Sequence, residues 1–453
     1  MKPILLTYYK HLSLEKVQFV NRYSKYKSIV ILTQNNKLSE QQANRFKKVE
    51  IIEVNSLKGV SRQITRIYKE RNPKVKIFPH FEGDAKSKFA IQAYNKLYGL
   101  KINPNLFKLK NWMNNFLADV SNKVSSRYTF DQLMDISYDE LCEVLGDHFI
   151  LKPVNADSSI LSFKITSEED FLKVQKKIKK KYKYILEKYI YGNLYAVDFF
   201  FDGSEVFVLC HTREITFSEL IEKFSTKHKQ KYQHIYDDYL YYLPIRYNLD
   251  FNHISTLEKR FIRSIGSKLK EVGYRGFIHL EYKINRKTKD IGFIEWGARP
   301  GGKRSDFIKK MFNITTFNLP YDLLYKKDRG DFKKEKGLYF LRNRNIDNNI
   351  VGIKTTVIEK THLLSILDKS DDYLSISYDT HIREFLKKNW KIRVKNISYS
   401  VRCSKDKFIY PFYLRSDTAF NYYIDLDELN YKRFLKNKSK IVEHLVFHDY
   451  SLD

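Results

Sequence analysis

The sequence predicts a mixed α/β and α+β protein with several domains. Its 453 residues exceed what a single hydrophobic core usually organises. Over the first hundred residues, short apolar runs alternate with helical patterns, which is typical of a parallel sheet with helices between its strands. Later apolar runs are joined by short polar turns, and this arrangement favours antiparallel hairpins.

The first unit, residues 1–105, is expected to hold the parallel sheet. Strands are predicted at residues 4–8, 29–33, 49–54 and 75–79. A helix is predicted over residues 82–98, because its apolar residues suit one helix face and Gly99 would end it. Another helix is predicted over residues 110–117, at the start of the next unit.

Residues 106–190 are expected to form a small α+β unit. Its predicted strands are residues 149–153, 160–165 and 184–187, and the polar loop 155–159 follows the first of them. A lysine-rich helix would begin after Ser167, with Phe171, Val174 and Ile178 on its buried side. The lysines would then form a solvated outer face.

Residues 191–330 are expected to contain two hairpins and a helix. Strands 195–201 and 206–210 flank the turn dipeptide Asp202-Gly203, and strands 277–284 and 291–296 flank the polar turn 285–290. The helix is predicted over residues 257–272 and would end at Gly273. Residues 331–453 mix short strands and helices, and they are assigned to an extra C-terminal α+β domain of unknown role.

Charge and hydropathy limit the kinds of partner. With 82 Lys plus Arg against 53 Asp plus Glu, the net charge is +29, which would attract polyanions. However, Lys, Asn, Ile and Tyr are abundant together throughout, so compositional bias explains the charge better than a dedicated patch. No nucleic-acid-binding motif is present, and nucleic acid therefore ranks last among the partners.

The remaining composition favours a folded, cytoplasmic protein without a membrane partner. A hydrophobic fraction of 43% with 15% aromatic residues argues against disorder. No apolar run approaches the roughly 18 residues of a membrane span, and the apolar stretch at residues 4–6 is too short for a signal peptide. Cys142, Cys210 and Cys403 are widely spaced and odd in number, so we expect reduced thiols.

Two strand ends carry residues suited to a nucleotide. Lys152 ends a hydrophobic strand just before a polar loop, where backbone N–H groups could surround a phosphate. The next strand runs into Glu187, Lys188 and Tyr189, whose backbone could hydrogen-bond an adenine edge. Taken singly, these two segments are better explained as an exposed lysine and an ordinary edge strand.

Two carboxylates lie inside otherwise apolar strands, at Glu281 and Glu295. An unpaired charge there would cost several kcal/mol, so each requires a partner. Paired across a hairpin, the two could share Mg²⁺, which binds a few carboxylates together with phosphate oxygens. Arg299 follows in the same segment, and it would lie on the face of Glu295 if the strand continued. A buried Glu–Arg ion pair without any ligand is the alternative.

In this order, the segments resemble the ATP-grasp superfamily, which includes D-alanine ligase, biotin carboxylase and the L-amino-acid ligases. The resemblance rests on the strand-Lys-Pro, the Glu-x-Tyr-Ile-x-Gly connector, the two strand glutamates and Arg-Pro-Gly-Gly, and it covers roughly residues 1–325. It implies an ATP-grasp fold with a pre-ATP-grasp domain (1–105), linker helices and a lid subdomain (106–190), a catalytic subdomain (191–330) and the extra domain 331–453.

The resemblance also implies a set of site residues. ATP would lie between the two subdomains, and the implied ATP-binding residues are Lys110, Lys152, Ser158, Ser159, Glu187, Lys188 and Tyr189. The implied Mg²⁺ ligands are Glu281 and Glu295. The implied catalytic residues are Arg299 and Lys152, while Lys303 and Arg304 would bind a second carboxylate of the substrates.

The implied reaction is carboxylate–amine ligation. ATP would phosphorylate a small-molecule carboxylate, and an amine would attack the acylphosphate to give an amide or peptide bond, with release of ADP and phosphate. Amino acids or a peptide are the favoured substrates, because the segment 297–302 resembles amino-acid ligases more than carboxylases or purine-pathway enzymes.

Three positions depart from the family pattern. The loop 155–159 lacks glycine, Leu194 stands where an acidic ribose-binding residue is expected, and Gly297 replaces an Asn ligand of the metal. Asn193 or Asp198 are the candidate substitutes for Leu194. These departures support an alternative, in which a degenerate ATP-grasp module binds nucleotide or a partner without catalysis. The C-terminal domain leaves three roles open: completing the acceptor pocket, forming a homodimer or recruiting a partner.

Overall fold

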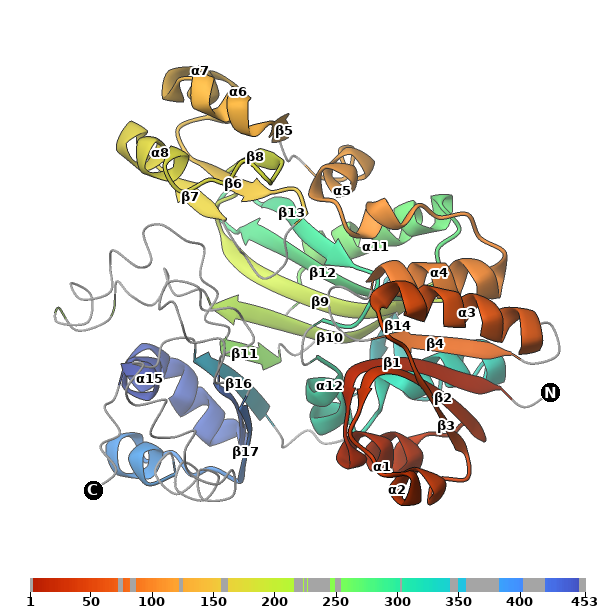
Figure 1. The fold of residues 1–453 in the computed structure, drawn as a ribbon. Helices are drawn as coiled ribbons and strands as arrows, with labels where there is room; N and C mark the ends of the chain where they lie inside the picture. Colours follow the sequence, from red (N-terminus) through yellow and green to blue (C-terminus); the bar gives the residue numbers. More distant parts are fainter. Residues whose placement is uncertain are drawn as a thin grey trace.

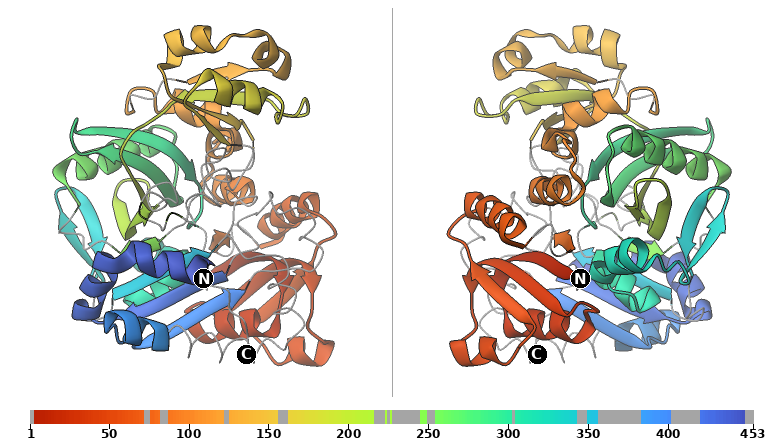
Figure 2. Two further views of the ribbon diagram at one scale, coloured as in Figure 1. Left: turned by 90° about the vertical axis from the view of Figure 1, so that its left-hand side faces the viewer. Right: turned by 90° about the vertical axis from the view of Figure 1, so that its right-hand side faces the viewer.

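The structure is a computed structural model, and it describes residues 3–71, 76–81, 87–121, 125–155, 162–215, 223, 226, 245–248, 254–301, 304–342, 349–355, 383–401 and 420–447. These residues form three sheets and the helices that cover them (Figure 1). We call them the N-terminal sheet, the small sheet and the central sheet. In Figure 2 the small sheet lies at the end of the molecule farthest from the N-terminal sheet.

The N-terminal sheet is parallel, as the sequence predicted, and its strand order is β3-β2-β1-β4. Its strands are β1 (Ile4–Leu12), β2 (Ser28–Asn36), β3 (Val49–Glu53) and β4 (Ile77–Phe81). The fourth strand extends beyond its predicted end at residue 79, and the predicted helix start at 82–86 lies outside the described residues. The helices of this unit are α1 (Leu14–Tyr23), α2 (Glu40–Asn44), α3 (Leu57–Arg71) and α4 (Ser87–Tyr98).

The small sheet is antiparallel, with the order β5-β8-β6-β7. Its strands are β5 (Ser125–Tyr128), β6 (Phe149–Pro153), β7 (Phe163–Ile165) and β8 (Tyr184–Lys188). One face packs on α6 (Phe130–Asp135), α7 (Tyr138–Leu145) and α8 (Glu168–Gln175) in a single apolar cluster. The Ser167 side chain caps α8, and Phe171 and Val174 are buried on it, as predicted. The helix ends at Gln175, so Ile178 is buried in the same cluster but lies beyond the helix that was predicted to carry it.

The central sheet is mixed and has the order β13-β12-β9-β10-β11-β16-β18-β17. Both predicted hairpins and the predicted helix are present, and the helix is α11 (Thr256–Glu271). The strands up to residue 297 are β9 (Asn193–Phe201), β10 (Val206–Ile215), β11 (Ile245–Asn248), β12 (Gly276–Asn285) and β13 (Asp290–Gly297). The short helical segments around them are η2 (Pro104–Phe107), α5 (Lys110–Phe116), α12 (Arg304–Phe312), η4 (Thr316–Asn318) and η5 (Tyr321–Lys326).

The described C-terminal strands extend the central sheet. β14 (Phe332–Glu335) and β15 (Leu338–Leu341) join beside β10. β16 (Asn349–Thr355), β17 (Asn396–Val401) and β18 (Phe420–Leu426) continue the sheet from β11, next to α15 (Glu428–Phe447). The C-terminal segment therefore shares backbone hydrogen bonds with the central sheet. The predicted domain limits at residues 105, 190 and 330 stay predictions.

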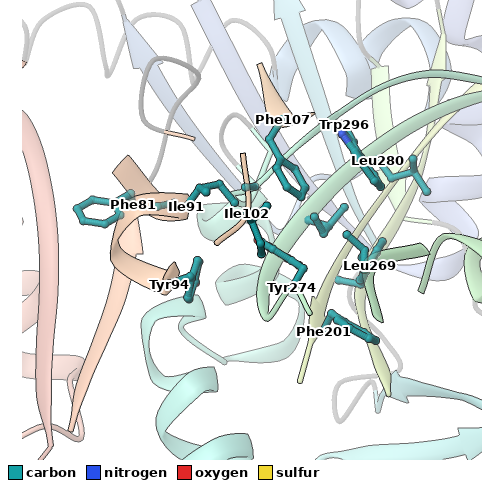
Figure 3. Close-up of a cluster of buried hydrophobic side chains, with 14 of the residues drawn as sticks. Phe81, Ile91, Tyr94, Ile102, Phe107, Phe201, Leu269, Tyr274, Leu280 and Trp296 are labelled. Atoms are coloured by element: carbon teal, nitrogen blue, oxygen red, sulfur yellow. The ribbon is translucent and has the colours of Figure 1, made fainter. Parts of the chain in front are cut away.

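One apolar core joins the N-terminal helices to the central sheet (Figure 3). Within it, the Trp296 ring stacks on Phe107 at a centroid distance of 5.0 Å, and Trp296 Nε1 donates to the Leu106 carbonyl at 2.8 Å. These contacts hold β13 beside η2. The labelled core residues are Phe81, Ile91, Tyr94, Ile102, Phe107, Phe201, Leu269, Tyr274, Leu280 and Trp296.

The connector between the small and central sheets requires glycine at residue 192. Gly192 has φ +116°, and a Cβ added there would lie 2.1 Å from the Ile284 carbonyl oxygen. Lys283 Nζ donates to the Ile190 carbonyl at 3.0 Å and to Tyr189 Oη at 3.2 Å. The connector is thus held tightly against β12.

None of the described helices has the length and hydropathy of a membrane span.

Candidate functional site

A buried lysine–glutamate pair occupies one face of the small sheet. Lys152 Nζ lies 2.6 Å from Glu187 Oε2, and both residues are buried. The two side chains are on the same face of the sheet because side chains alternate along a strand. Glu187 pairs with Ile150, which is two residues before Lys152 on β6. Asn114 of α5 donates to Glu187 Oε1 at 2.9 Å. The pair therefore has the further hydrogen bond that a buried charge requires.

Lys110 connects the small sheet with the central sheet. It is the first residue of α5, and its backbone N–H donates to the Val154 carbonyl at 3.3 Å. Its side chain is buried, and Nζ lies 3.7 Å from Glu295 Oε2 on β13. α5 therefore contacts the surroundings of both lysines that sequence reasoning singled out: Lys110 reaches Glu295, and Asn114 reaches Glu187, the partner of Lys152.

A β-bulge brings the two strand glutamates together. From Asn285 to Tyr282, β12 pairs with β13 in regular register, and Tyr282 is opposite Phe293. The next residue, Glu281, is opposite Glu295, so Ile294 has no partner in the pairing. In a regular register Glu295 would share a face with Phe293 and point into the core. The bulge turns it to the face of Glu281. Directly opposite residues have Cβ atoms about 5 Å apart, so one cation can reach both carboxylates.

Behind Glu281 lies a buried group of charged residues. His279 Nε2 is 3.0 Å from Glu281 Oε1, and His279 Nδ1 is 3.2 Å from Asp198 Oδ1. Asp198 also accepts from the Gly301 N–H at 2.6 Å, and Arg304 Nε lies 3.2 Å from its Oδ2. Burial would raise the pKa of Asp198, but these cationic and N–H partners outweigh it and keep the pKa below its ordinary value.

Stability should fall with rising pH through His279. Burial alone would lower the pKa of His279, but Asp198 and Glu281 outweigh burial and raise it to about 10. The ordinary pKa of histidine is about 6.5. The stabilisation that protonated His279 gives to the folded state is therefore complete below pH 6.5 and is lost between pH 6.5 and 10. We expect the free energy of unfolding to lose up to about 1.4 kcal/mol per pH unit there, relative to His279→Gln. Urea titrations of both proteins at pH 7 and 9 measure this, and parallel pH dependences would contradict it.

Arg299 lies beyond the end of β13, which stops at Gly297. The strand does not continue to Arg299, so the condition for placing Arg299 on the face of Glu295 by strand alternation is not met. Its side chain lies beside Gly297, where an added Cβ would be 3.5 Å from Arg299 Cγ, and Nη1 donates to the Pro300 carbonyl at 3.0 Å. Burial lowers the pKa of Arg299 to about 10, so the guanidinium stays cationic at neutral pH.

Two sequence expectations need correction. Arg304, expected to bind a substrate carboxylate, is 1% exposed and paired with Asp198. Asp198, a candidate ribose ligand, is also 1% exposed and held by His279, Arg304 and Gly301. Leu194 is fully buried in β9, and of its two candidate substitutes only Asn193 is partly exposed.

The remaining predicted residues have separate positions. Lys188 is exposed, and the Tyr189 ring lies between Lys164 and Lys283, whose Nζ atoms are 4.6 and 4.3 Å from its centroid. Ser158, Ser159 and Lys303 lie outside the described residues. Sequence reasoning missed Asn114 and His279. Their spacing from predicted site residues could have revealed them. Asn114 is one helical turn after Lys110, and His279 is two residues before Glu281, so each shares a face with its neighbour.

Two sheets thus meet at a site with two buried lysines, two opposed carboxylates and an arginine, and the chain has the ATP-grasp fold. It is similar to an L-amino acid ligase from Bacillus licheniformis (13% identity, 97% of each chain covered, TM-score 0.58). It is also similar to N5-carboxyaminoimidazole synthetase from Staphylococcus aureus in complex with ADP (12%, 98% of each chain, 0.56).

A third similar structure is biotin carboxylase from Campylobacter jejuni, at 12% identity, with 94% of this chain and 87% of that chain covered and a TM-score of 0.52. At such identities the likeness shows the fold. No family model and no curated protein sequence matches the chain. Among the described residues, no cluster of three or more His, Cys, Asp or Glu side chains suits a metal ion.

Proposed function

We propose that the protein is an ATP-dependent carboxylate–amine ligase that forms an amide or peptide bond through an acylphosphate and releases ADP and phosphate. One observation carries this proposal: the bulge at Ile294 sets Glu281 and Glu295 side by side, next to Lys110. Carboxylates and a lysine gathered at one point suit a bound polyphosphate with its cation. The fold shared with an L-amino acid ligase supports the same conclusion.

ATP would lie between the small sheet and the central sheet. Lys110 and Lys152 would neutralise its phosphates, aided by Ser158 and Ser159 of the loop after β6. The backbone of the connector residues Glu187, Lys188 and Tyr189 would contact adenine. The fixed directions of both lysines support these roles, because a positioned charge stabilises phosphoryl transfer without reorganisation.

The chemistry of the donor set fits magnesium. The side chains of Glu281 and Glu295 are 17% and 39% exposed, so neither is fully buried. Mg²⁺ takes one or two carboxylates plus substrate phosphates, and these two residues would hold it. When bound, the ion would neutralise charge on the transferring phosphoryl group. At the position of the expected third ligand, Gly297 supplies no side-chain oxygen, so substrate phosphate oxygens would complete the coordination.

Arg299 would stabilise the acylphosphate and the oxyanion formed when the amine attacks. Its guanidinium is cationic at neutral pH and is held by the Pro300 carbonyl, so its direction is set before substrate arrives. We propose amino acids or a peptide as substrates, since the segment 297–302 resembles amino-acid ligases and one similar structure is such an enzyme.

ADP release tests the proposal. Purified protein with ATP and Mg²⁺ should release ADP when offered a pooled panel of amino acids and small carboxylates, and Glu295→Gln should not. Glu169→Gln makes the same chemical change on the exposed side of α8 and should behave as wild type. If the wild-type protein binds ATP but releases no more ADP than Glu295→Gln, the function is instead that of a degenerate binding module.

A further inference from the structure

A continuous row of polar contacts runs from Glu281 into the protein. Glu281 is hydrogen-bonded to His279, and His279 to Asp198. Asp198 in turn accepts from the Gly301 N–H and is paired with Arg304. His279 and Asp198 have side chains only 8% and 1% exposed. The proposed function uses Glu281 but leaves this buried row without a role.

Sheet register explains why these side chains line up. Asp198 on β9 pairs directly with His279 on β12, and His279 pairs with Gly297 on β13. Glu281 is two residues from His279, so it lies on the same face one step along the strand. Because Gly297 has no side chain, it adds no polar partner to His279 from β13. The imidazole therefore lies between two carboxylates.

This arrangement fixes the direction of the imidazole ring. Both ring nitrogens face carboxylate oxygens at 3.0 to 3.3 Å, so a rotation of the ring would break both contacts. Asp198 is itself held, because the Gly301 N–H donates to its Oδ1 and Arg304 pairs with its Oδ2, so it is not free to follow such a rotation. A carboxylate that accepts from His279 through one oxygen can coordinate a cation through the other.

We propose that His279, held by Asp198, is a positioning residue that orients Glu281 toward a magnesium–nucleotide complex. This inference rests on the proposed function and deepens it. Asp198 has a second effect, because its bond to the Gly301 N–H ties the segment that carries Arg299 to the same support. One buried anion thus sets the position of the metal-side carboxylate relative to the arginine segment.

Two amide substitutions separate the two bonds of His279. His279→Asn places an amide near the Nδ1 position, so it can keep the bond to Asp198 but loses the bond to Glu281. His279→Gln reaches the Nε2 position and can keep the bond to Glu281. The measurement is the dissociation constant of ATP with Mg²⁺ and with EDTA, together with the melting temperature of each protein.

We expect His279→Asn to lose about tenfold or more of the tightening that Mg²⁺ gives to ATP binding, because loss of a residue that supports a metal ligand costs 10–100-fold. Its ATP affinity in EDTA should stay within about twofold of wild type, whereas His279→Gln should keep most of the Mg²⁺ effect. His211→Asn is the matched control: His211 is fully buried in the same sheet but bonds to Tyr282 Oη at 2.8 Å. It should keep the full Mg²⁺ effect.

Different outcomes reject different statements. An unchanged Mg²⁺ effect in His279→Asn, or an equal loss in His279→Gln and His279→Asn, overturns the inference alone. If Mg²⁺ does not tighten ATP binding by wild type, the magnesium assignment of the proposed function falls and the inference falls with it. If His279→Asn does not fold, ¹⁵N-histidine spectra of wild type decide, with His279 assigned by His279→Gln. Its signal should shift with Mg²⁺ and ATP but not with ATP and EDTA, and an unmoved signal overturns the inference.

Discussion

Arg299→Ala is expected to reduce the turnover number for ADP release by about 10³-fold while changing ATP affinity less than about threefold. Arg299 is held by the Pro300 carbonyl, and burial lowers its pKa to about 10 without discharging it at neutral pH. Its charge would act mainly on the negative charge that develops on the acylphosphate and on the oxyanion formed when the amine attacks. Its loss therefore affects the transition state more than the bound nucleotide.

Steady-state kinetics with the substrates found in the panel, and ATP binding at equilibrium, measure the two effects separately. Arg299→Lys should be intermediate, because it keeps the charge but loses the planar fork. Arg329→Ala is the control. Arg329 pairs with Glu205 at 2.7 Å and lies away from this site, so its loss should leave turnover unchanged. A variant Arg299→Ala with more than a tenth of wild-type turnover would argue against a catalytic role.

The second large effect concerns stability. Glu187→Gln should lower the free energy of unfolding by about 3–5 kcal/mol, because it leaves the Lys152 charge buried without its partner. The side chains of this pair are only 8% and 4% exposed, and their N–O distance is 2.6 Å. Solvent therefore cannot compensate for the missing carboxylate.

Urea unfolding of wild type and Glu187→Gln measures this cost. Glu169→Gln is the matched control, since Glu169 also pairs with a lysine, Lys173, but the two side chains are 78% and 53% exposed. Exposed pairs contribute little, so this variant should unfold like wild type. The double change Lys152→Met with Glu187→Leu should recover much of the lost stability and still fail to support ADP release. Equal stabilities of Glu187→Gln and Glu169→Gln would contradict the argument.

The sequence by itself determined the order and kind of the elements. Local signals sufficed there: the turn dipeptide Asp202-Gly203 closes the hairpin β9–β10, and the Ser167 cap begins α8. Lys152 and Glu187 were singled out in the sequence as a phosphate-binding lysine and an adenine-contacting connector residue, and these roles stay predictions. Their direct pairing was not foreseen, since it depends on which strands are neighbours in the small sheet.

Only the tertiary structure decided how the site is assembled. A regular hairpin would pair Glu281 with Ile294, and the bulge that brings Glu295 there depends on how Phe293 and Trp296 pack in the core. From the sequence, Arg304 was expected to bind a substrate. In the structure it pairs instead with buried Asp198, on a strand about a hundred residues earlier in the chain. The C-terminal strands likewise join the central sheet by pairing over long sequence separations. Such strand pairings depend on which sheet edges and helix faces are neighbours in the folded protein. The local sequence around each strand does not specify them.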